Sequence, residues 1–150
     1  MSTSQLAMLT GLAKDARDQA GKVLAQERQT EQQTTAQLQS LLSYRAEYAE
    51  RLQKAMRDGI DPATMYNYQQ FLASLDAALS RARQALAAQQ ASVQQSQKNW
   101  QQEQRKLSSY DTLASRRLLE EHRRSERHEQ KTNDDLVTSR LARQHNDTPH

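Results

Sequence analysis

Arg57-Asp-Gly-Ile-Asp-Pro-Ala63 is the strongest interruption in a chain of 150 residues that otherwise favours helix. Gly59 can adopt the positive φ that ends a helix. Asp61 can cap a second helix whose first residue is Pro62, and the proline also disfavours a helical conformation at Asp61 itself. The stretch therefore predicts two helices joined by a turn at about residues 58–61. Because the connection is short, the helices are expected to be antiparallel neighbours.

The composition limits how wide the structure can be. Hydrophobic residues make up only 35% of the chain and aromatic residues 5%, and the mean hydropathy is -1.03. This small amount of apolar surface cannot fill a broad core. Either disorder or a thin structure with one apolar seam is therefore expected. Gln, Ala, Leu, Arg and Glu are common and form helices well, whereas the chain has only three Gly and two Pro. We therefore predict an all-α fold, a long antiparallel two-helix coiled-coil hairpin.

The second predicted helix has a clear heptad pattern. Residues spaced alternately four and three apart form a seam that is mostly apolar, with polar exceptions at Gln89, Ser96 and Glu103. Trp100 lies on this seam and is predicted to be a large core anchor. The seam consists of Tyr68, Leu72, Leu75, Leu79, Ala82, Leu86, Gln89, Val93, Ser96, Trp100, Glu103, Leu107, Tyr110 and Ala114.

The first predicted helix has a less regular pattern. Its apolar residues suggest a seam near the turn and another near its start, separated by the polar stretch 26–37. That polar stretch would face the polar exceptions of the second helix. The residues predicted to face inward are Leu38, Leu42, Ala49, Leu52 and Met56 near the turn, and Leu6, Leu9, Ala13, Ala16, Ala20 and Val23 near the start.

These patterns predict a single hairpin over residues 1–143 and a flexible tail over 144–150. The first helix is expected at about 2–57 and the second at about 62–143. Folding about the turn places Leu6 opposite the region of Ala114. The second helix after about residue 118 would then lack a partner and form a highly charged overhang.

A second stripe of apolar and aromatic residues lies beside the seam near the turn. Its members follow heptad spacing one position away from the seam, and both halves fall at the same end of the hairpin. Because two helices can cover only one seam, the stripe is expected to stay partly exposed and to bind a partner. The alternative is that its tyrosines only widen the seam. The stripe comprises Gln37, Leu41, Tyr44 and Tyr48 in the first helix, and Phe71, Leu75 and Ala78 in the second.

Several kinds of chemistry find no support in the sequence. The chain has no cysteine, and His122 and His128 do not share a helix face, so no metal site is expected. No nucleophile, base and orienting group converge, and no Gly-rich phosphate loop is present, so neither an enzyme nor a cofactor is predicted. The net charge of +3 comes from mixed signs, which is typical of a solvated helical surface rather than a nucleic-acid footprint. No apolar run approaches the length of a membrane span and no secretory signal is evident, so a cytoplasmic location is expected.

Three short motifs resemble the FliJ family. They are Tyr44-Arg-Ala-Glu-Tyr48, Gly59-Ile60 and Asn67-Tyr-Gln-Gln-Phe71, followed by Trp100 and the region of Leu107 and Leu113. The resemblance implies a hairpin similar to the central stalk of rotary ATPases, such as the γ subunit of ATP synthase. It also implies a component of the flagellar type III protein export apparatus, at the cytoplasmic face of the inner membrane.

The resemblance further implies partners and the surfaces that bind them. The paired termini would enter the ring of the hexameric export ATPase FliI, the turn-side half would reach the export gate protein FlhA, and the protein would escort export chaperones. By position, the gate-binding residues would be Gln37, Leu41, Tyr44, Tyr48, Phe71, Leu75 and Ala78. The ATPase-binding residues would be Arg116, Arg117, Arg123, Arg124, Arg127 and Lys131.

Two other functions remain open at this point. The same architecture would suit the equivalent stalk protein of a virulence type III secretion system, with different partners. A function of another class is non-specific nucleic-acid binding by a basic coiled coil, which would weaken steeply with added salt.

Overall fold

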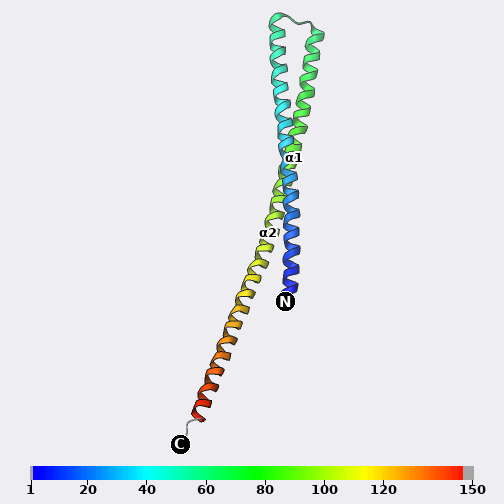
Figure 1. Ribbon diagram of the computed structural model, residues 1–150. Helices are drawn as coiled ribbons and strands as arrows, with labels where there is room; N and C mark the ends of the chain where they lie inside the picture. Colours follow the sequence, from blue (N-terminus) through cyan, green and yellow to red (C-terminus); the bar gives the residue numbers. More distant parts are fainter. Residues whose placement is uncertain (1, 147–150) are drawn as a thin grey trace. The chain divides into compact units, whose positions relative to one another are not determined.

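The computed structural model describes residues 2–146, which form two long helices (Figure 1). The first helix, α1, spans Thr3–Asp58, and the second, α2, spans Pro62–Asn146. The two run antiparallel and pack against each other, and no strand occurs within the described range. The predicted all-α two-helix hairpin fold is confirmed.

The chain divides into two compact units. One unit comprises Asp15–Gln104 and includes the turn; the other joins the residues up to Lys14 with those from Arg105 onward. Within each unit a segment of α1 lies beside a segment of α2. α2 extends three residues beyond the predicted end at 143, and residues 147–150 of the predicted tail lie outside the described part. The single hairpin over 1–143 stays a prediction.

Local hydrogen bonds define both helix starts. At α1, the Ser2 backbone N–H donates to Gln5 Oε1 at 3.1 Å, and the Gln5 N–H donates to Ser2 Oγ at 3.2 Å. This reciprocal pair is a capping box. At α2, the Thr64 hydroxyl donates to the carboxylate of the cap residue Asp61. Between the helices, Gly59 has a φ of 95°, a left-handed conformation that a residue with a Cβ rarely adopts.

The α2 seam has the register predicted from the sequence. Every predicted seam residue from Tyr68 to Glu103 is buried or half-buried within the unit 15–104. Leu79 is 3% exposed and the polar Ser96 is 7% exposed. In the other unit, Leu107 is buried, and Tyr110 and Ala114 are half-buried. The heptad assignment of the second helix is confirmed.

The α1 seam differs from the prediction. Leu42 and Met56 are 40% and 51% exposed, and Ala16 and Val23 are also exposed. The sequence reading followed apolar residues, but the inward line admits polar ones, because long side chains in a thin pair can reach solvent from a seam position. In the unit 15–104 the inward line is Arg17, Ala20, Leu24, Glu27, Glu31, Thr34, Leu38, Leu41, Arg45, Tyr48, Leu52 and Ala55.

Trp100 is half-buried on the seam, next to the only glycine in the middle of α1. A Cβ placed on Gly21 would lie 3.4 Å from both Cδ1 and Nε1 of the indole. The indole therefore lies over Gly21, with room for a methyl group at contact distance but not for a larger side chain.

The unit that contains both ends of the described chain has a short core. Leu6 is 3% exposed, and Ala13 and Leu107 are each 5% exposed. From residue 118 to residue 146 every described side chain is exposed. This part of α2 therefore buries no apolar face within its own unit.

Candidate partner-binding surface

The seven residues predicted to bind a partner near the turn occupy two kinds of position. We call them the aromatic face: Gln37, Leu41, Tyr44, Tyr48, Phe71, Leu75 and Ala78. Leu41, Tyr48 and Leu75 belong to the seam itself, whereas the other four each directly precede a seam residue. In an antiparallel pair, positions that precede the seam on both helices flank the same side of it. The aromatic face is therefore one side of the helix pair within the unit 15–104.

Exposure separates the members of the aromatic face. Tyr44 is 55% exposed and Phe71 is 41% exposed. Tyr48 is half-buried, and Leu75, at 9% exposure, is part of the core. The prediction that Leu41 and Tyr48 lie one position off the seam is wrong, because the seam of α1 runs through Leu41, Arg45 and Tyr48 rather than through Leu42. Tyr44 and Phe71 are the large side chains that this face offers to a partner.

The aromatic rings of the two helices contact each other. The centroids of Tyr48 and Phe71 are 4.3 Å apart, with their planes tilted by 46°. The Arg51 guanidinium lies over the Tyr48 ring, with its Cζ 5.0 Å from the centroid. Arg51 Nη2 also lies 2.7 Å from Glu47 Oε1, one turn earlier. The half-buried Tyr48 ring is thus contacted by Arg51 of α1 and by Phe71 of α2.

An ion pair between α1 and α2 lies beside the seam in the same unit. Arg45 donates through Nε and Nη2 to the two carboxylate oxygens of Asp76. The hydrogen bond and charge of Asp76 raise the pKa of Arg45. Conversely, the hydrogen bond from Arg45 lowers the pKa of the Asp76 carboxyl; desolvation opposes this shift, and the charges of Arg45 and Arg83 add to it. Asp76 directly follows the seam residue Leu75, so the pair lies on the side away from Tyr44 and Phe71.

The polar middle of the unit is joined by side-chain hydrogen bonds. Gln89 Nε2 donates to the backbone oxygen of Glu27 at 3.0 Å and also to the Glu27 carboxylate. Arg17 Nη1 donates to Gln104 Oε1 at 3.5 Å. Glu27 of the polar stretch of α1 therefore meets Gln89, one of the polar exceptions of α2.

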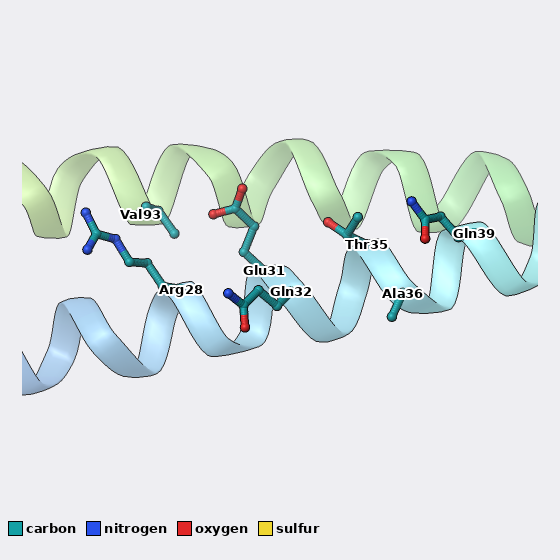
Figure 2. A pocket seen from close by; sticks show the side chains of 7 residues that line it. All are labelled: Arg28, Glu31, Gln32, Thr35, Ala36, Gln39 and Val93. Carbon is teal, nitrogen blue, oxygen red and sulfur yellow. The ribbon is translucent and has the colours of Figure 1, made fainter.

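A shallow hollow of about 450 Å³ opens over this polar middle (Figure 2). Glu31 reaches toward α2, consistent with its inward position, and Val93 is the one contribution of α2. The small side chains of Thr35 and Ala36 leave the hollow open. The lining combines two amides, one hydroxyl, one carboxylate and one guanidinium. Its residues are Arg28, Glu31, Gln32, Thr35, Ala36, Gln39 and Val93.

The basic residues predicted to bind the ATPase ring lie on the exposed part of α2. Arg117 is half-buried near the α1 start, where Thr3, Leu6, Ala114 and Leu118 line a largely apolar groove of about 340 Å³ with it. The other five are exposed; they are Arg116, Arg123, Arg124, Arg127 and Lys131. Five of the six predicted ATPase-binding residues are therefore exposed to solvent on α2.

The chain is similar to known proteins in sequence and in fold. A family model described as flagellar FliJ protein matches residues 1–146. The chain belongs to the flagellar FliJ protein family. The flagellar FliJ protein of Escherichia coli K12 is 33% identical over 122 residues, covering 79% of this chain and 83% of that protein, and the protein of Salmonella typhi gives the same values.

A solved structure shows the same fold. A putative YscO homologue from Chlamydia trachomatis superposes with a TM-score of 0.68, covering 97% of this chain and 94% of that one. The sequences are only 12% identical, so this likeness concerns the fold alone. The FliJ family resemblance inferred from the turn-side motifs is confirmed by the family model and the two flagellar relatives.

Three features of this FliJ family member escaped the sequence reading. Arg45 was not placed in the seam, its partner Asp76 was not identified, and Arg51 was not connected with Tyr48. A signal existed for Arg51, because residues three apart on a helix are neighbours and Glu47 stands four residues before it. The signal for Arg45 was weaker, because an arginine interrupts an apolar pattern and its partner Asp76 is 31 residues away in the chain.

Residues 2–146 contain neither a cluster of metal-binding side chains nor a helix that could cross a membrane. That range holds no cluster of three or more His, Cys, Asp or Glu side chains able to bind a metal ion. Neither of its helices is apolar over a length sufficient to cross a bilayer.

Proposed function

We propose that this chain is a non-enzymatic component of the flagellar type III protein export apparatus. The observation that carries the proposal is the family match over residues 1–146, together with 33% identity to two flagellar FliJ proteins. Flagellar relatives favour this system over a virulence secretion system.

We further propose that the exposed end of α2 acts as a stalk in the ring of the export ATPase FliI. Support comes from its exposure over residues 118–146 and from the four predicted cationic contacts in that range, Arg123, Arg124, Arg127 and Lys131. Exposed charges on a single helix suit a narrow pore, where they orient the partners and speed their encounter. Acidic side chains stand among these cations; the carboxylate of Glu126, for example, lies 2.9 Å from Nε2 of His122.

The aromatic face is proposed to bind the export gate protein FlhA. Tyr44 and Phe71 supply exposed aromatic surface next to a packed seam, and aromatic residues are enriched at the centres of protein interfaces. Contact with the ATPase and the gate would keep the protein peripheral to the cytoplasmic face of the inner membrane. An escort role toward export chaperones belongs to the same proposal.

The test is deletion of the gene in the source organism. We expect loss of swimming and of flagellar filament protein from the medium, both restored by a plasmid copy. A pull-down from the restored cells should capture the ATPase and the gate protein. Normal filament export in the deletion strain, with loss of virulence-protein secretion instead, would assign the chain to the other type III system.

A further inference from the structure

Arg51 lies next to the aromatic face and has not been assigned to it. It follows Gln37 and Tyr44 at the same heptad position, each of the three directly preceding an inward residue of α1. Its side chain therefore leaves the helix on the side where Tyr44 and Phe71 are exposed. Of these three residues, Arg51 lies closest to the turn.

Two contacts fix where the Arg51 side chain goes. Its guanidinium lies over the Tyr48 ring, 5.0 Å from Cζ to the centroid, and Nη2 lies 2.7 Å from the Glu47 carboxylate. A guanidinium at this distance from a ring is attracted by the negative charge of the ring face. Arg51 and Glu47 are both 53% exposed, so the ion pair alone stabilises the helix little. Its effect is to restrict the rotamers that place the guanidinium on Tyr48.

Tyr48 in turn contacts Phe71, whose centroid is 4.3 Å away on the other helix. A chain of contacts thus runs from Glu47 through Arg51 and Tyr48 to the exposed ring of Phe71. Side chains that are already ordered before binding lose less conformational entropy when a partner docks. Arg51 can therefore influence binding at Phe71 without touching the partner.

We propose that Arg51 is a positioning residue of the aromatic face: it holds the Tyr48 ring against Phe71 in the arrangement that the export gate recognises. This inference rests on the proposed gate-binding function. The occupant is the cytoplasmic domain of the gate, which is expected to offer an apolar site for the Phe71 ring. Arg51 acts through Tyr48 rather than through its own charge.

The test begins with titrations of the purified cytoplasmic domain of the gate against the full-length chain. Arg51→Ala should weaken binding roughly two- to fivefold, the range expected for loss of one exposed cation–ring contact. Arg51→Lys should recover part of the affinity, because an ammonium also interacts with a ring. Arg57→Ala is the matched control: Arg57 is an exposed arginine of α1 that does not precede a seam residue, and its loss should leave the affinity unchanged. Helical circular dichroism should be the same in all three variants.

A double-mutant cycle then separates positioning from direct contact. In the background of Phe71→Ala, adding Arg51→Ala should cost little more, because the ring that Arg51 positions is gone. An additive loss would mean that Arg51 contacts the gate by itself, which overturns the inference. Weak binding by Phe71→Ala with unchanged binding by Arg51→Ala overturns it as well, while leaving the gate-binding proposal intact. Unchanged binding by Phe71→Ala would overturn both.

Discussion

Arg45 binds Asp76 across the two helices, and this ion pair explains how an arginine occupies the inward line of α1. The side chains of Arg45 and Asp76 remain 42% and 53% exposed, so the charges meet in solvent at the edge of the pair. The aliphatic stem of an arginine can cover the seam while its head reaches out. Exposed ion pairs add little to stability. The pair is better suited to fixing which residues of the two helices lie opposite each other.

The acid limit of stability should depend on Asp76. Its pKa is lowered in the folded chain, so the carboxylate stabilises the fold above its ordinary pKa of 3.8, and this contribution is lost as pH falls through the folded value. Asp61 behaves likewise, because the Thr64 hydroxyl and backbone N–H groups lower its pKa. Thermal melts from neutral pH into the acid range should therefore show a shallower decline for Asp76→Asn and Asp61→Asn than for the parent. Parallel curves would contradict the assigned ion pair and cap.

Leu79 and Leu42 should respond very differently to the same change. Leu79 is 3% exposed, whereas Leu42 was expected in the seam but is 40% exposed. Leu79→Ala should cost about 2–4 kcal/mol of unfolding free energy, as is typical of core leucines, and Leu42→Ala less than about 1 kcal/mol. Urea unfolding followed by circular dichroism measures both. Equal losses would show that the inward line of α1 has been assigned incorrectly.

The three glycines should give three different results when changed to alanine. Gly11→Ala adds a Cβ that meets nothing within 4 Å, so it should stabilise the chain by about 0.5–1 kcal/mol through helix propensity. Gly59→Ala should destabilise it by about 1 kcal/mol, because Gly59 has positive φ. Gly21→Ala should be tolerated, since its Cβ would only reach contact distance from Trp100.

Gly21→Val is the informative companion variant. Its extra methyl groups should push against the indole, lower the melting temperature and shift the tryptophan fluorescence. Trp100 is the single tryptophan of the chain, so the fluorescence reports on this contact alone. An unshifted spectrum would mean that the ring does not lie over Gly21.

Tyr44 and Tyr48 should separate binding from folding. Tyr44 is 55% exposed, so Tyr44→Ala should leave the melt nearly unchanged while weakening binding to the gate domain by about 1–2 kcal/mol, a value typical of an aromatic contact residue. Tyr48→Ala should lower the melting temperature as well, because the ring packs on Phe71 in the seam. A melt and a titration on the same sample of each variant decide the matter. Normal binding by Tyr44→Ala would remove it from the gate-binding surface.

Deleting residues 120–150 should abolish stimulation of the export ATPase without unfolding the unit 15–104. The described part of this segment is exposed throughout, so little buried apolar area is lost with it. The measurements are ATP hydrolysis by the purified ATPase and the melt of the truncated chain. Changing Arg123, Arg124 and Arg127 together to Gln in the full-length chain tests whether their positive charge is needed for stimulation. Full stimulation by the truncated chain would show that this end is not the stalk.

Much of the fold follows from short-range chemistry. Gly59, Asp61 and Pro62 mark the turn because each favours a backbone conformation that a continuous helix excludes. The α2 register was readable because its inward residues are mostly apolar and therefore stand out every three or four positions. Identification of the family from the residues around the turn depended on the same local patterns.

The tertiary structure alone decided which face of α1 points inward. Leu41 and Leu42, or Tyr48 and Ala49, are adjacent apolar residues, and periodicity within one helix cannot choose between them. The choice follows from α2, where Asp76 accepts the Arg45 guanidinium and Gln89 bonds to Glu27, so that polar residues of α1 are satisfied at seam positions. Helix formation depends on neighbours along the chain, whereas the facing of two helices depends on pairs 31 and 62 residues apart, which no local pattern contains.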